Sequence, residues 1–227
     1  MQTYKRNQVE EAVTRVFAGH SETSPSELHT RIKRLLGLDR DLGRKPRSKD
    51  AARANFAFFS DEGPGRGADI SFSEYESFAL LNALRMMEHG WPQGFAVSLL
   101  RRGRSQLEQE HARILRRPPA EDTPSNENPV AGEVPEYPGQ VLLTVLSNAD
   151  RTPDQPKGLL RLCHSFQESM TLLRQNAMSQ MTTFELTVAA HRLRHALAET
   201  RPRRRGRNSP PTRTLVSNRA VYFCALL

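Results

Sequence analysis

The chain has few of the residues that usually mark a metal site or a secreted protein. Its 227 residues include two cysteines, Cys163 and Cys224, which lie far apart without Cys or His partners at metal-ligand spacing. This argues against a zinc site and a disulfide framework. The N-terminal segment MQTYKRNQVEEAV lacks the apolar region of a secretory signal, and no long apolar run predicts a membrane span. We therefore expect a cytoplasmic protein without a metal or cofactor.

Motifs typical of enzyme active sites are also missing. The sequence has no phosphate-binding glycine loop followed by Lys-Ser/Thr, no Gly-x-Ser-x-Gly turn and no convincing pair of carboxylates. Cys163 and His164 are neighbours whose side chains would point about 100° apart on a helix, which prevents a nucleophile–base pair. His191 and His195 share a helix face, but the flanking arginines favour a solvated basic face over a metal site. The sequence predicts a protein that is not an enzyme.

Positive charge is what the chain has in excess. There are 33 Lys and Arg against 25 Asp and Glu, a formal net charge of +8 and a pI near 10.1. Such a surface attracts phosphate polyanions, so nucleic acid is the first partner to expect. An anionic membrane is less favoured because no basic amphipathic helix with aromatic anchors is present. The 37% hydrophobic content and mean hydropathy of -0.62 predict a modest core with polar linkers or tails.

Composition divides the chain into four parts. Residues 118–140 are rich in Pro, Glu and Asn without apolar periodicity, which predicts a flexible linker. Residues 201–227 begin with RPRRRGR and form a basic tail. Between them, 141–200 is predicted to be a small α+β domain, and residues 1–117 form the first domain. Within 141–200 we expect a buried strand at 141–146, a helix over 157–176, and a strand start followed by a helix over 183–199.

Two helices are predicted at the start of the first domain. Apolar spacing indicates an amphipathic helix over 5–17. The next begins at Ser24, which can cap it, with Pro25 in the first position, and Gly37 provides a left-handed stop that makes it short. Two such helices are typical of a helix-turn-helix, although an ordinary helical hairpin has the same spacing. The outward face of the second helix carries Ser26, His29, Thr30, Lys33 and Arg34.

A basic loop and a predicted hairpin follow. The aromatic run 56–59, a glycine-rich turn with Arg66 at its tip, and residues 70–72 predict a short β-hairpin, or wing, although a plain surface turn has similar composition. A wing arginine can bind a phosphate or the minor groove. The cations that precede this hairpin are Arg40, Arg44, Lys45, Arg47, Lys49 and Arg53.

Further helices are predicted after the hairpin. Ser73-Glu74-Tyr75-Glu76 reads as a capping box that starts a helix ending at His89-Gly90. A short helix over 95–102 follows, with Arg101, Arg102 and Arg104 near the solvent side. A separate helix over 105–117 has a narrow apolar stripe, which either pairs two subunits or packs back on its own domain.

Residues 70–107 resemble the part of the MerR transcription regulators that follows their wing. Phe72-Ser73 stands at the helix start and His89-Gly90-Trp91-Pro92 at the turn. The resemblance covers residues 3–107 and is mainly one of element order. The sequence departs from the family at 33–36, where Lys-Arg-Leu-Leu replaces its usual Arg-Tyr-Tyr-Glu run, and in a longer first inter-helix loop. The resemblance implies a winged helix-turn-helix and a DNA-binding dimer. The whole chain is also similar to uncharacterised proteins of alphaproteobacteria, which implies a bacterial origin.

The sequence therefore predicts a mainly α fold: an N-terminal winged helix-turn-helix with a short β-hairpin wing, plus a small α+β C-terminal domain. We expect a transcriptional regulator that binds a palindromic site on double-stranded DNA as a homodimer. The alternative is a protein-interaction adaptor whose basic tail binds nucleic acid nonspecifically. RNA binding is less favoured because no stacking-aromatic strand motif is present. In the regulator, Ser26, His29, Thr30, Lys33 and Arg34 would face the base edges, while Arg44, Lys45, Arg47 and Arg66 would hold phosphates.

Overall fold

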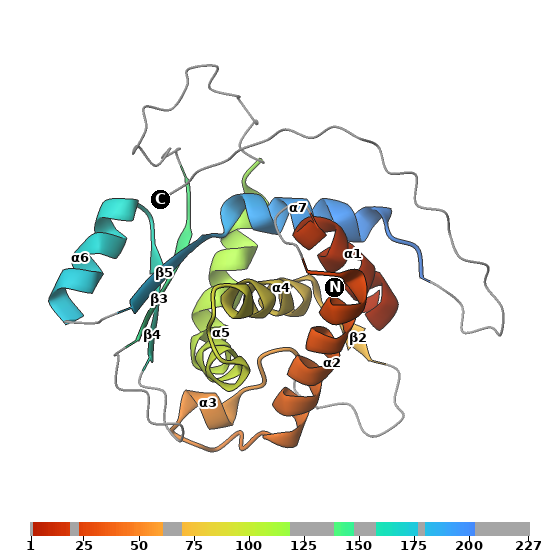
Figure 1. Cartoon of the computed structure of the whole chain (residues 1–227), viewed down its shortest axis with the longest axis horizontal. Helices are drawn as coiled ribbons and strands as arrows, with labels where there is room; N and C mark the ends of the chain where they lie inside the picture. The colour runs from red at the N-terminus through yellow and green to blue at the C-terminus, as the bar shows by residue number, and fades with distance from the viewer. Residues whose placement is uncertain are drawn as a thin grey trace.

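The computed structural model of the protein describes residues 2–18, 23–60, 70–118, 139–147, 158–176 and 180–202. These parts are mainly helical and contain two small antiparallel sheets (Figure 1), which confirms the predicted helical class. Within them, no helix is both long and apolar enough to cross a membrane. The elements are β1 (Tyr4–Lys5), α1 (Arg6–Ala18), α2 (Pro25–Asp41), α3 (Ala51–Ala54), β2 (Ser71–Phe72), α4 (Glu74–Glu88), α5 (Gln93–Arg116), β3 (Leu142–Ser147), β4 (Gly158–Cys163), α6 (Phe166–Asn176), β5 (Gln180–Glu185) and α7 (Thr187–Glu199).

The two predicted capping sequences fix where α2 and α4 begin. Ser24 is the N-cap of α2, and its hydroxyl accepts a hydrogen bond from the backbone N–H of Glu27 at 3.3 Å. At α4, Ser73 and Glu76 form a complete capping box, in which each side chain accepts from the other residue's backbone N–H. These bonds satisfy amide groups that have no partner inside the helix. Local sequence therefore determines both helix starts.

Two of the predicted helix ends are wrong. The helix that starts at Pro25 continues through Gly37 to Asp41, and the left-handed glycine is Gly43, with φ of 62°. The second helix is therefore 17 residues long rather than short. The predicted break before residue 105 does not occur either, because α5 continues through Gly103. A Cβ at Gly103 would lie 3.0 Å from the side chain of Leu160, so this glycine accommodates a neighbouring strand instead of ending a helix.

The C-terminal part is built on a three-stranded antiparallel sheet with strand order β4-β3-β5. The central strand β3 is buried along its length, and the sheet lies between α6 and α5 (Figure 1). The strand predicted at 141–146 and the strand-to-helix change over 183–199 are confirmed. The helix predicted over 157–176 is wrong in its first half, because Gly158–Cys163 form β4 and the helix starts only at Phe166.

The N-terminal and C-terminal parts share one hydrophobic core. Buried residues from Tyr4 to Leu197 belong to a single cluster, and α7 packs along α1 (Figure 1). Glu74 of α4 pairs with Arg194 of α7 at 2.6 Å. The apolar stripe of α5 lies inside this core. Of the two predicted roles for this stripe, packing against the same chain is therefore the one observed. The predicted linker and basic tail lie almost entirely outside the described residues.

The sheet packs against the start of α5 at Gly158. A Cβ at Gly158 would lie only 2.3 Å from the ring of Phe95. Trp91 stacks on that ring with 4.9 Å between centroids, and its indole N–H donates to Thr182 of β5 at 3.0 Å. The close approach of β4 to α5 therefore requires a residue without a side chain.

The change Gly158→Ala should destabilise the protein by about 1–3 kcal/mol, because the added methyl group must displace the buried Phe95 ring. Urea unfolding followed by circular dichroism measures this. Gly94→Ala is the matched control, since a Cβ there meets nothing within 4 Å. It should be neutral or slightly stabilising, as alanine favours a helix. Equal unfolding midpoints for wild type and Gly158→Ala would contradict the packing described.

A buried histidine lies in the shared core. His111 of α5 packs against Phe78 with 4.6 Å between ring centroids and is 4% exposed. Burial lowers the pKa of His111 from 6.5 to about 4; the charge of Glu74 opposes this, whereas Arg194 and His191 lower the pKa further. The folded protein therefore holds His111 neutral at pH values where an unfolded chain would protonate it.

Stability should consequently fall as the pH drops from about 6.5 toward 4, since the unfolded chain binds one more proton in this window. The contribution of His111 to the free energy of unfolding is fully present above pH 6.5 and amounts to roughly 3 kcal/mol relative to the value below pH 4. Urea unfolding at a series of pH values measures it. His111→Leu should flatten this dependence, whereas His195→Gln, which changes an imidazole with 78% of its side chain exposed, should leave it in place. An unchanged pH slope in His111→Leu would refute this account.

Candidate nucleic-acid interface

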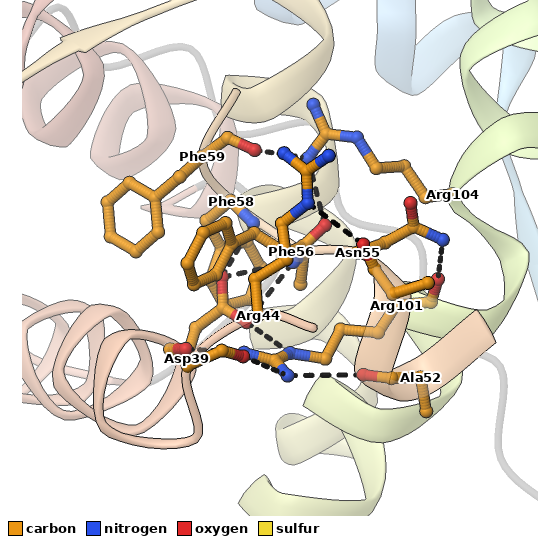
Figure 2. Close-up of polar contacts among 12 residues, drawn as sticks. Asp39, Arg44, Ala52, Asn55, Phe56, Phe58, Phe59, Arg101 and Arg104 are labelled. Atoms are coloured by element: carbon orange, nitrogen blue, oxygen red, sulfur yellow. Dashed lines mark hydrogen bonds and ion pairs between the residues drawn. The ribbon is translucent and has the colours of Figure 1, made fainter. Parts of the chain in front are cut away.

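A buried ion pair joins the end of α2 to the middle of α5. Arg101 Nε lies 2.6 Å from Asp39 Oδ1, and the two side chains are 4% and 0% exposed. Asp39 also accepts hydrogen bonds from the backbone N–H groups of Ala57 and Phe58 at 3.0 to 3.1 Å. Figure 2 shows these contacts. The carboxylate is thus surrounded by donors from two parts of the chain, as a buried charge requires.

The same arginine holds the segment that follows α2. Arg101 Nη1 donates to the backbone carbonyls of Gly43 at 3.0 Å and Ala52 at 3.1 Å, on the two sides of the basic loop. Its other amino group donates to the carbonyl of Asp39. Lys45 N–H completes the loop by donating to Arg53 O at 2.7 Å. One guanidinium therefore fixes the path of residues 39–55.

A second arginine, one helical turn further along α5, holds the aromatic run. Arg104 Nη1 donates to Phe56 O at 2.9 Å and to Phe59 O at 2.6 Å (Figure 2). Because side chains occupy these carbonyls and the amides between them, residues 56–59 form no strand. The predicted pairing of 56–59 with 70–72 is wrong, since β2 pairs with β1, with Phe72 opposite Tyr4. The glycine-rich turn and Arg66 lie outside the described residues.

The predicted solvent exposure of these two arginines is wrong. Arg101 and Arg104 were expected near the solvent side of a short helix, but they are buried and half-buried, and only Arg102 is exposed. The signal that could have found Arg101 is Asp39, an acidic residue in line with the apolar positions of α2. Its place on the inner face of that helix predicts a buried charge, which must have a cationic partner.

The basic loop runs from Leu42 to Asn55 and contains five basic residues and one acidic residue, Asp50. Lys45, Arg47 and Lys49 are exposed. Arg44, one of the predicted phosphate contacts, is half-buried and its Nε donates to Ala54 O at 2.9 Å. Arg44 therefore supports the loop as well as adding charge. The backbone of the loop is held at both ends, and its remaining basic side chains extend from this fixed backbone.

The outward face predicted for α2 is exposed at all five positions, Ser26, His29, Thr30, Lys33 and Arg34. Thr30 Oγ1 donates to Ser26 O at 3.0 Å. His29 Nδ1 lies 3.2 Å from Glu10 Oε2 of α1, so this imidazole is tied to an acidic partner. Lys33 and Arg34 lie about two turns before the helix ends at Asp41. They make no ion pair with any residue that the structure describes.

No protein-family model and no curated protein matches this chain. The resemblance to the MerR regulators therefore stays a prediction from sequence. Functional assignment consequently depends on the geometry just described: an exposed helix face, a basic loop that continues from its C-terminal end, and the buried arginine that fixes the loop.

Replacing Arg101 tests whether this ion pair holds the loop. Arg101→Met should cost about 3–5 kcal/mol in unfolding free energy, because Asp39 would stay buried without its cationic partner. It should also speed tryptic cleavage at Arg44 and Arg47 under native conditions, since the loop loses its anchor.

The matched control is Arg102→Met, which removes the neighbouring but exposed arginine and should change stability by less than about 0.5 kcal/mol. Chemical unfolding and timed proteolysis of the three proteins give both readouts. Equal proteolysis rates in the two variants would argue against Arg101 as the anchor of the loop.

Proposed function

We propose that the protein is a DNA-binding transcriptional regulator. The outward face of α2 contacts the base edges of double-stranded DNA, and the basic loop after it holds phosphates. The helix-turn-helix order suggested by the sequence, without the hairpin predicted between 56–59 and 70–72, belongs to this proposal, with α2 as the recognition helix. The protein binds a palindromic site as a homodimer, because two copies of one recognition helix read two symmetric half-sites.

The observation that carries the proposal is a group of exposed cations without ion-pair partners. Lys33, Arg34, Lys45, Arg47 and Lys49 make no ion pair within the described parts of the chain. Several arginines nearby are paired instead, as in Arg6–Glu10, Arg15–Glu11 and Arg31–Glu27, each at 2.6 to 2.7 Å. A cation that is already paired with a carboxylate contributes little binding free energy when it contacts a phosphate. The unpaired group is therefore the part of the described surface best suited to a polyanion.

The fixed backbone of the loop supports the same conclusion. Loops that order themselves on binding lose conformational entropy, which weakens the complex. Here Arg101 holds both sides of the loop at Gly43 and Ala52. The loop cations therefore start from defined positions.

The chemistry of the α2 face supports sequence reading in addition to charge. Ser26 and Thr30 carry hydroxyl groups, and Lys33 and Arg34 carry charged donors, on the same exposed side of the helix. In the major groove, arginine and lysine pair with guanine, and hydroxyl groups can pair with either donors or acceptors. This mixture suits base recognition better than a purely cationic face would.

Lys33→Ala should weaken binding to a preferred DNA fragment about tenfold or more while affecting random DNA less. Arg47→Ala should weaken binding to all fragments similarly, and it should reduce the slope of log K against log salt concentration by about one. The experiment selects fragments from genomic DNA in excess competitor, then measures anisotropy at several salt concentrations. Arg174→Ala is the charge-matched control, because its exposed side chain lies on α6, at the opposite end of the molecule from α2 (Figure 1). It should leave both quantities unchanged.

The adaptor alternative predicts a different result in the same assay. If the five arginines between 201 and 207 are replaced by glutamine in the intact chain, an adaptor loses DNA binding. A regulator retains its fragment preference and loses only part of the salt-dependent affinity. Uniform binding that vanishes with these arginines would overturn the proposed function.

A further inference from the structure

Helix α5 exposes one side of its C-terminal part to solvent. Each exposed position there has another three or four residues further along, which places them all on the same side of the helix. Residues between them, such as Leu107, His111 and Ile114, are buried in the core. We call the eight exposed residues the polar face of α5: Arg102, Ser105, Gln106, Gln109, Ala112, Arg113, Arg116 and the C-cap residue Arg117.

The polar face of α5 is purely basic in charge. It contains four arginines and no aspartate or glutamate. The exposed positions of α2, α6 and α7, in contrast, each include a carboxylate, for example Glu27, Glu168 and Glu199. The positive charge of α5 is therefore not offset along its own exposed surface.

Two of the four arginines on this face have no acidic partner. Arg113 pairs with Glu110 at 2.7 Å, and Arg117 Nη1 donates to a backbone carbonyl at 3.5 Å. Arg102 and Arg116 make no ion pair within the parts of the chain that the structure describes. Their guanidinium groups can therefore contact an external anion without first breaking a contact inside the protein.

The polar face of α5 begins where the basic loop ends. Asn55, the last residue of the loop, donates from Nδ2 to Arg101 O at 3.4 Å, and Arg101 Nη1 donates to Ala52 O at 3.1 Å. Arg102 is thus the next residue along α5 after the one that holds the end of the loop. Arg53, with 71% of its side chain exposed, lies between the two contacts in sequence. The basic loop and the polar face of α5 are therefore adjoining parts of one positive surface.

The length and chemistry of this face suit a polyanion better than a protein partner. From Arg102 to Arg116 the helix rises about 21 Å, which is the axial length of roughly six base pairs of duplex DNA. The face has no large apolar side chain of the kind that a protein interface buries at its centre. A second copy of the chain would place arginine against arginine, which is unfavourable. Arginine, glutamine and serine side chains all bind phosphate oxygens.

We propose that the polar face of α5 binds the phosphates of duplex DNA that flanks the site contacted by α2. Arg102 and Arg116 pair with phosphates, and Gln106 and Gln109 donate hydrogen bonds to phosphate oxygens between them. The duplex passes from the α2 face across the basic loop to α5, so the bound DNA is longer than the palindrome. This inference rests on the proposed DNA-binding function and adds the extent of the DNA that is bound.

The test compares two duplexes that carry the same preferred site. One covers only a palindrome of about 20 base pairs, and the other adds about ten base pairs on each side. The full-length wild-type protein should bind the longer duplex about tenfold more tightly, because each protomer contacts additional phosphates. The slope of log K against log salt concentration should also be larger by about two per protomer. Fluorescence anisotropy at several salt concentrations measures both quantities.

A double variant locates the additional contacts. Arg102→Gln combined with Arg116→Gln should remove the advantage of the longer duplex and leave binding to the shorter one unchanged. The charge-matched control combines Arg161→Gln on β4 with Arg174→Gln on α6, both exposed in the wild type. Arg161 lies opposite Thr144 of β3, whose hydroxyl contacts α6, so both control residues are on the side of the sheet away from α5 (Figure 1). The control should keep the full advantage, and equal urea unfolding midpoints confirm that both variants fold.

Failure of this inference and failure of the proposed function give different patterns. If the wild type prefers its site but binds both duplexes equally, or if the two double variants lose the advantage equally, the inference is overturned and the regulator stands. If the wild type has no preferred site, or binds no duplex, the proposed function fails and this inference fails with it.

A fluorescent poly-glutamate is titrated in parallel as a probe for an acidic protein partner. We expect it to bind much more weakly than the longer duplex. Binding as tight as that of the duplex, lost in the Arg102→Gln and Arg116→Gln double variant, would assign this face to an acidic protein and overturn the inference.

Discussion

The buried ion pair between Asp39 and Arg101 is the contact on which the arrangement of the N-terminal helices depends. A buried pair of this kind adds little net stability over an apolar pair, because desolvating two charges offsets most of their attraction. Its effect is on geometry. The carboxylate draws the amides of Ala57 and Phe58 toward α2, and the guanidinium holds the carbonyls on both sides of the basic loop. Residues 39–58 are thus shaped by polar contacts more than by regular secondary structure.

The parts of the fold that sequence predicted well are those decided by near neighbours. Ser24 and Ser73 cap their helices with hydrogen bonds to residues three positions away, and the apolar spacing of α1 and α2 places the correct side inward. The exposed face of α2 followed from the same spacing. The identities of its five outward residues were therefore predictable, although their role in binding is still a proposal.

The parts that sequence missed are decided by distant contacts. The run 56–59 has the composition of a strand, but Arg104 and Asp39 occupy its backbone groups. Gly37 resembled a helix stop, yet a glycine ends a helix in this way only when the chain adopts a left-handed conformation there, as it does at Gly43. Strand β4 was read as helix because short apolar runs fit both periods, and its pairing with β3 settles the choice.

The way in which the basic loop is anchored has an evolutionary consequence. Arg101 contacts the loop through main-chain carbonyl oxygens, at Gly43 and Ala52, and these oxygens are present whatever side chains the intervening residues carry. Mutations at Lys45, Arg47 or Lys49 would change what the loop recognises while its frame stays in place. Related chains could therefore diverge in binding preference within this loop at little cost in folding, so long as the aspartate and the arginine beneath it are kept.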